Sequence, residues 1–161
     1  MQFSMRVFGR LALVLSLIGS LTLGGAAVSS AKPHARTLKV TAFDYGYGGL
    51  PRTVKAGTYG LNFKNVGREP HELVTVGLLD KDISEAKILA ALDAGSDGSG
   101  IVDFSKFAGF AFAEPRGPAQ TSGDFTFAPG TKYLYLCFIP NANGVPHYKL
   151  KPGMLGFITA R

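Results

Sequence analysis

The amino-acid sequence predicts an all-β sandwich with one helical insertion in its middle. Short segments in which apolar and polar residues alternate recur along the chain, and this period of two is typical of strands that bury one face. Turn-forming residues separate the segments, and the chain contains 21 glycines and 9 prolines. Several short strands with turn signals between them indicate a sandwich.

Four strands are predicted in the first half of the chain. Apolar and polar residues alternate over residues 38–42 and again over residues 59–63. Val54 lies in a short strand between two turns, and residues 71–76 are rich in β-branched residues, which favour strands. The Gly- and Tyr-containing stretch 45–51 is interpreted as a bend.

One helix is predicted, over about residues 83–94. Asp82 and Glu85 have the spacing of a capping box, an alanine-rich segment follows, and Gly95 marks the end. The helix belongs to an insertion of about residues 79–120. Four aromatic residues cluster in the second part of this insertion, and we interpret them as a small apolar core under a long connection: Phe104, Phe107, Phe110 and Phe112.

Strand patterns return in the last third of the chain. A short alternating segment covers residues 124–127, and the largely apolar segment 133–138 is typical of a buried strand. Residues 154–160 form the last predicted strand. The last third therefore consists, like residues 38–76, of short strands joined by turns.

The N-terminus has the pattern of a secretory signal peptide. Arg6 and Arg10 precede an apolar run over residues 11–23, and small residues follow. Cleavage is expected after Ala31, with Ala27 as an alternative. An uncleaved membrane anchor is the second interpretation, but the run is shorter than the roughly 20 apolar residues of a bilayer span. We therefore expect export to a periplasmic or extracellular compartment, with no stable membrane insertion.

The remaining residues, 32–161, are enough for one domain with its own core. Removal of Arg6 and Arg10 lowers the formal net charge from +6 to +4. This mild basic excess forms no Lys- or Arg-rich cluster and does not indicate nucleic-acid binding. It favours solubility and the steering of an acidic protein partner, and we expect a monomer.

The chain contains a single cysteine, Cys137. Exported proteins usually pair their cysteines in disulfides, so an isolated thiol is expected to be buried, catalytic, linked to another chain or bound to a metal.

Four residues in the chain suit a metal site: His71, Cys137, His147 and Met154. His71 begins a predicted strand, Cys137 ends one, His147 lies in the loop that follows, and Met154 opens the last strand. Taken singly, each has an ordinary structural explanation. Together, one thiolate, two imidazoles and a weak thioether form the set that favours copper in electron transfer. Zinc is less suitable, because structural zinc sites usually show paired Cys or His spacing.

Three motifs resemble those of the cupredoxins, the plastocyanin- and azurin-type blue copper proteins: Asn65-Val-Gly67 with Pro70-His71, Gly130-Thr131 with Tyr135-Leu-Cys137, and Pro146-His147 with Gly153-Met154-Leu-Gly156. The resemblance covers most of residues 38–160 outside the insertion. It implies a Greek-key sandwich that binds one type 1 copper ion, with His71, Cys137 and His147 as equatorial ligands and Met154 as axial ligand.

The sequence departs from the family beside two of these ligands. Glu72 and Phe138 stand where many members have an Asn after the first His and a Ser or Thr after the Cys. These residues put in question the hydrogen bond that usually locks the two ligand segments together, and such contacts tune metal affinity and potential.

The leading functional hypothesis is a one-electron carrier that is not an enzyme. An exposed edge of His147, ringed by Val145, Pro146 and Pro140, is the expected docking face for a redox protein. Three alternatives stay open: a copper carrier or chaperone, a metal-free interaction module, and an enzyme with Cys137 as nucleophile. Only the last requires a reactive thiol.

Overall fold

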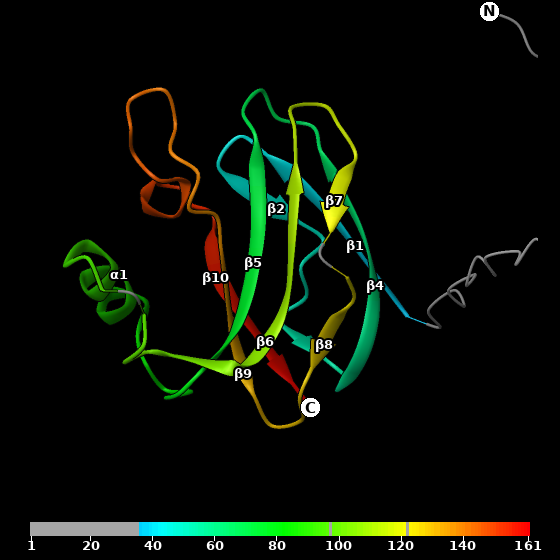
Figure 1. The fold of residues 1–161 in the computed structure, drawn as a ribbon, viewed down its shortest axis with the longest axis vertical. Coiled ribbons are helices and arrows are strands. Elements are labelled where there is room, and N and C mark those ends of the chain that lie inside the picture. Colours follow the sequence, from blue (N-terminus) through cyan, green and yellow to red (C-terminus); the bar gives the residue numbers. More distant parts are fainter. Residues whose placement is uncertain (1–35, 97, 122) are drawn as a thin grey trace, which may run out of the picture. The chain divides into compact units, whose positions relative to one another are not determined.

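The computed structural model describes residues 36–161 except residues 97 and 122. The predicted signal peptide lies outside the described residues. Two β-sheets and one α-helix make up the described domain (Figure 1). The prediction of an all-β sandwich with a helical insertion is confirmed.

Each sheet collects strands from distant parts of the chain. The four-stranded sheet has the order β2 (Gly46–Gly48), β1 (Thr37–Phe43), β4 (Gly57–Asn65) and β8 (Phe125–Phe127). The six-stranded sheet has the order β3 (Thr53–Val54), β10 (Leu155–Ala160), β9 (Lys132–Leu136), β5 (His71–Leu78), β6 (Val102–Ala113) and β7 (Ala119–Thr121). The bend predicted over residues 45–51 is partly wrong, because β2 pairs there with β1.

The order of the strands is that of a Greek key. β5, β6 and β7 are consecutive antiparallel neighbours. The chain then crosses to the other sheet as β8 and returns as β9, which pairs with β5 rather than with β7. This return places the start of β5 beside the end of β9, and so brings two distant segments of the chain together.

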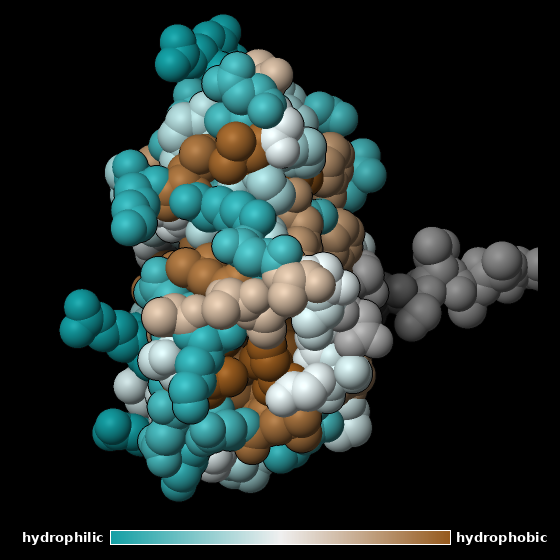
Figure 2. Space-filling view, turned by 90° about the vertical axis from the view of Figure 1, so that its left-hand side faces the viewer, coloured by the Kyte–Doolittle hydropathy of each residue, from teal (hydrophilic) through white to brown (hydrophobic). Residues whose placement is uncertain are grey.

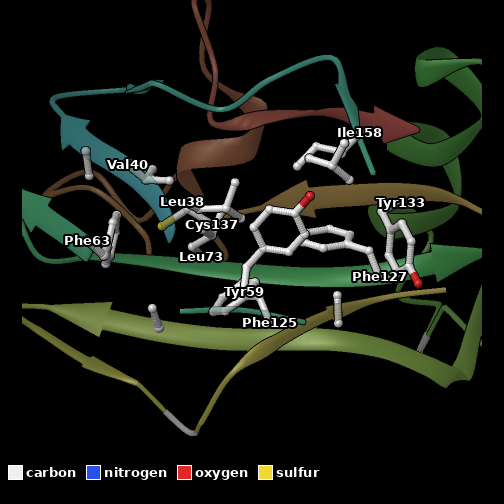
Figure 3. Close-up of a cluster of buried hydrophobic side chains, with 14 of the residues drawn as sticks. Leu38, Val40, Tyr59, Phe63, Leu73, Phe125, Phe127, Tyr133, Cys137 and Ile158 are labelled. Carbon is white, nitrogen blue, oxygen red and sulfur yellow. The ribbon is translucent and has the colours of Figure 1, made fainter. Parts of the chain in front are cut away.

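The main core lies between the inner faces of the two sheets. Figure 3 shows Phe127 and Tyr133 in one part of this cluster, with Leu38, Leu73 and Cys137 in the other. All five side chains are buried. Along each strand, core residues alternate with outward-facing ones, because successive side chains of a strand point to opposite faces of the sheet.

The only α-helix among the described residues, α1 (Glu85–Asp93), packs on a second apolar cluster. Ser84 caps it, because the Ser84 side chain accepts a hydrogen bond of 3.3 Å from the Lys87 N–H. The predicted start at about residue 83, with Asp82 as the cap, is therefore two residues too early. Ile88 is fully buried in a cluster with Leu134 and other residues. Within the described part of the chain, no helix is long and apolar enough to cross a membrane.

The four phenylalanines of the predicted insertion do not form a core under a loop. They lie in β6, which pairs with β5 at both of its ends, with two register shifts between them. Phe104 and Phe107 are 61% and 48% exposed and line an apolar pocket of about 210 Å³ together with Phe138. The interpretation as a satellite core is wrong because β6 turns its small residues, Ala111 among them, toward the main core. Figure 2 views the side that carries α1 and shows apolar side chains exposed in a recess there.

Candidate metal centre

The four predicted ligands lie where strands begin or end. His71 is the first residue of β5, and Cys137 directly follows β9. His147 opens the 3-10 helix η1 (His147–Lys149), and Met154 directly precedes β10. In Figure 1 the start of β5, the end of β9 and the start of β10 lie at the same end of the sandwich.

Main-chain hydrogen bonds fix the three ligand segments near the C-terminus. The Cys137 N–H donates to the Met154 carbonyl at 3.0 Å, and the Met154 N–H donates to the His147 carbonyl at 3.0 Å. The His147 N–H donates to the Ile139 carbonyl at 2.9 Å, which closes the base of the loop. Backbone hydrogen bonds therefore position these three residues independently of any contact of their side chains.

The side chains of His71, Cys137 and His147 converge. The two imidazole Nδ1 atoms are 3.1 Å apart, and Nδ1 of His147 is 3.5 Å from Sγ of Cys137. All three donor atoms lie within 4.8 Å of one another, and all three residues are fully buried. Metal bonds of about 2.0–2.1 Å to nitrogen and about 2.3 Å to sulfur join donors roughly 3–4 Å apart. The separations of 3.1 Å and 3.5 Å that His147 makes with the other two donors thus match those that a single metal ion requires.

The types of donor atom in this cluster favour copper. A trigonal set of one thiolate and two imidazoles is suited to both copper oxidation states, whereas carboxylate-rich sets favour harder cations. Met154 is also fully buried, in the same core cluster as Cys137. Its role as the weak axial ligand stays a prediction.

Burial changes the ionisation of the thiol. It raises the pKa of Cys137 to about 11, so the thiol keeps its proton at neutral pH while no metal is bound. A metal ion that binds the thiolate must release this proton. Burial and the neighbouring His147 lower the pKa of His71, which favours the neutral imidazole that a metal needs.

The hydrogen bond between the two ligand segments, which the sequence put in question, is present in another form. The Glu72 carboxylate accepts a hydrogen bond of 2.8 Å from the Phe138 N–H. The Glu72 N–H in turn points at Sγ of Cys137, at 3.5 Å. Glu72 therefore joins the segments that carry His71 and Cys137, because the longer Glu side chain reaches the backbone beyond the cysteine.

The expectation of an exposed His147 edge is wrong. The His147 ring is fully buried, and its Nε2 atom lies 2.8 Å from Oε2 of Glu69. The Tyr45 ring packs edge-on against it, with the ring centroids 5.2 Å apart. These two side chains, which come from other loops, cover the imidazole. Val145, two residues before His147, is 36% exposed.

Sequence reasoning missed the residues on the outer side of the imidazoles. Asp44 and Tyr45 follow β1, and Glu69 lies in the loop between β4 and β5. The spacing of these residues from His71 and His147 in the sequence gives no sign that they lie beside the imidazoles. Tyr45 has a positive φ of 68°, which fits a tight turn, but no residue type in the sequence marks this position.

Comparison with known proteins supports the fold. No family model matches the chain, and no curated protein matches it. Among solved structures, the dithionite-reduced auracyanin of Roseiflexus castenholzii is 21% identical, with a TM-score of 0.50 over 79% of this chain and 98% of that one. Auracyanin A of Chloroflexus aurantiacus, described as a "blue" copper protein, is 24% identical, with a TM-score of 0.50 over 78% of this chain and 98% of that one. The chain therefore has the cupredoxin fold that its ligand motifs predicted.

Proposed function

We propose that this chain is an exported, mononuclear type 1 copper protein that carries single electrons between redox partners. The observation that carries the proposal is the convergence of two imidazole Nδ1 atoms and one cysteine Sγ in a fully buried cluster. His71, Cys137 and His147 would hold the copper ion as equatorial ligands, and Met154 would be the axial ligand. When bound, copper supplies one oxidisable centre that alternates between two oxidation states.

The protein's contribution is a rigid and dry donor set. Each donor side chain stands on a strand end or on a loop fixed by backbone hydrogen bonds, so the donors are in place without rearrangement of the chain. Burial excludes water from the centre. A centre that changes little between its two states favours fast electron transfer and offers no open position for a substrate.

The same burial argues against the alternative functions. A copper chaperone needs donors that a partner's donors can reach, whereas these three are 0% exposed. A nucleophilic cysteine needs a thiolate, whereas burial raises the pKa of Cys137 to about 11. A metal-free module gives no reason to bury two imidazoles and a thiol within 4.8 Å of one another.

The similarity to two auracyanins, one of them described as a "blue" copper protein, supports this assignment. The signal-peptide pattern of residues 1–31 supports export to a periplasmic or extracellular compartment. The basic excess of the chain supports an acidic redox protein as the partner and a soluble monomer as the carrier. Val145 offers an exposed apolar contact on the loop that holds His147.

Voltammetry combined with a chelator challenge tests this function. The copper-loaded protein should give a reversible one-electron wave, and a strong copper chelator should remove the metal only slowly. Rapid loss of copper without a reversible wave would favour the copper carrier. Failure to bind copper at all would favour the metal-free module.

A further inference from the structure

Both imidazoles of the candidate centre face a carboxylate on the side away from Cys137. Nε2 of His147 lies 2.8 Å from Oε2 of Glu69, within hydrogen-bond distance. Nε2 of His71 lies 3.7 Å from Oδ1 of Asp44, which is beyond hydrogen-bond distance. The two carboxylates are each 25% exposed, while both imidazoles are fully buried. They therefore stand between the rings and the solvent.

The loop that carries Glu69 is held in place independently of the imidazoles. The Asn65 side-chain amide donates to the Glu69 carbonyl at 2.8 Å, and its oxygen accepts from the Gly67 N–H at 2.8 Å. Arg68 donates to Asp44 through its backbone N–H at 2.7 Å and through Nε at 3.1 Å. Because Asn65 is fully buried, this network fixes the backbone of the loop.

The close approach of this loop also restricts its sequence. A Cβ atom at Gly67 would collide with the Asp44 carboxylate and would come within 2.9 Å of Nε2 of His71. Glycine is therefore needed for the loop to lie against the imidazoles. The cover is a packed part of the structure and not a single side chain that happens to fold inward.

We propose that Glu69 is a positioning residue for His147, in two ways. Its carboxylate accepts the Nε2 proton of the ring, which leaves the Nδ1 lone pair directed at Sγ of Cys137 and at the metal. Its negative charge strengthens His147 as a donor and favours the more positive copper(II) state, which lowers the reduction potential. This inference rests on the proposed copper function and adds to it a residue that both tunes and shields the centre.

Asp44 supplies the contrast. Hydrogen bonds from Arg68 hold its carboxylate, and its distance to His71 is nearly one ångström longer than the corresponding distance from Glu69 to His147. The two imidazoles are thus unequal, and His147 is the one that Glu69 orients by a direct hydrogen bond.

Two variants of Glu69 and one matched control test the proposal. Glu69→Gln keeps an acceptor for Nε2–H and removes the charge, so the reduction potential should rise while the visible band stays in place. Glu69→Ala removes both the acceptor and the charge, so the reduction potential should rise and the copper(II) affinity should fall by about 10- to 100-fold. Because the variant also loses the cover over the ring, added imidazole or azide should change the copper spectrum. Asp82→Asn removes an equal charge beyond the far end of β5 and should change none of these.

A measurement without copper completes the test. Ring ¹⁵N NMR of the metal-free protein should show His147 as the Nε2–H tautomer, and Glu69→Ala should shift the ring toward a mixture of tautomers. If the wild type forms the copper centre but Glu69→Gln has the potential of Asp82→Asn, and Glu69→Ala leaves the tautomer unchanged, the role of Glu69 is overturned. If the wild type forms no coloured centre while the NMR result stands, the proposed copper function fails and the positioning of His147 survives.

Discussion

Removing the Glu72 side chain is expected to loosen the candidate centre without exposing it. In Glu72→Ala the Phe138 N–H loses its 2.8 Å acceptor, while the backbone contacts of Glu72 to Cys137 and Tyr47 are unchanged. A hydrogen bond to a charged group contributes about 1.5–3 kcal/mol. Because Phe138 is 45% exposed, water can partly replace the lost hydrogen bond in the variant. We therefore expect the free energy of unfolding to fall by about 1–2 kcal/mol.

Urea denaturation of the metal-free protein measures this loss. The midpoint should fall while the slope of the unfolding free energy against urea stays constant, because the folded state buries the same surface. Glu72→Gln is the matched control, since its amide oxygen can still accept from the Phe138 N–H and only the charge is lost. It should be destabilised by roughly half as much.

The copper spectrum separates a local effect from a general one. In Glu72→Ala the segment after Cys137 is less tightly held, so the visible charge-transfer band should shift or broaden, whereas in Glu72→Gln it should stay near its wild-type position. Unchanged stability and an unchanged spectrum in Glu72→Ala would refute the argument that this residue joins the two ligand segments.

Three further predictions concern the axial ligand, the thiol and the docking face. Met154→Leu should keep the visible band and raise the reduction potential and Met154→Gln should lower it; loss of copper binding in Met154→Leu would make Met154 a primary ligand. The pKa of Cys137 in the folded protein is raised to about 11, so the stability contributed by the protonated thiol in the metal-free protein should be complete below about pH 8.5, the ordinary thiol pKa, and should be lost as the pH rises toward 11. Urea denaturation at a series of pH values measures this loss, and Cys137→Ser should not show it. Val145→Glu should slow electron exchange with an acidic partner, more at low salt than at high salt, and leave the copper spectrum unchanged; unchanged exchange kinetics would place docking elsewhere.

Much of the fold could be predicted because period-two alternation is a local property of the chain. The segments around Leu38 and Phe63 place alternate residues in the core between the sheets, and these strands are present where the alternation predicted them. The pattern failed in β6, because its phenylalanines lie on the outer side of the sheet while its alanines occupy the core. Aromatic content suggested a separate cluster, whereas the small inward residues decided the packing.

The candidate centre, too, could be predicted from the sequence only in part. Ligand residue types and their positions at strand ends are visible in the sequence, and the structure brings His71, Cys137 and His147 together. The carboxylates that face the imidazoles could not be predicted from the sequence. Asp44 and Glu69 lie in turns, and the packing of the sheets decides where these turns lie in the folded protein. The burial of His147 could not be predicted from its loop, since residues of other loops cover it.

The binding of copper(II) to the purified metal-free protein tests the central claim most directly. Titration followed by visible absorption and electron paramagnetic resonance should show one copper ion per chain, an intense charge-transfer band from the Cys137 thiolate and the resonance of a trigonal copper–thiolate centre. Cys137→Ser should lose the band even where weak binding persists. A wild-type protein that is saturated with copper and remains colourless, or that keeps its colour in Cys137→Ser, would contradict the assignment of this buried cluster as an electron-transfer centre.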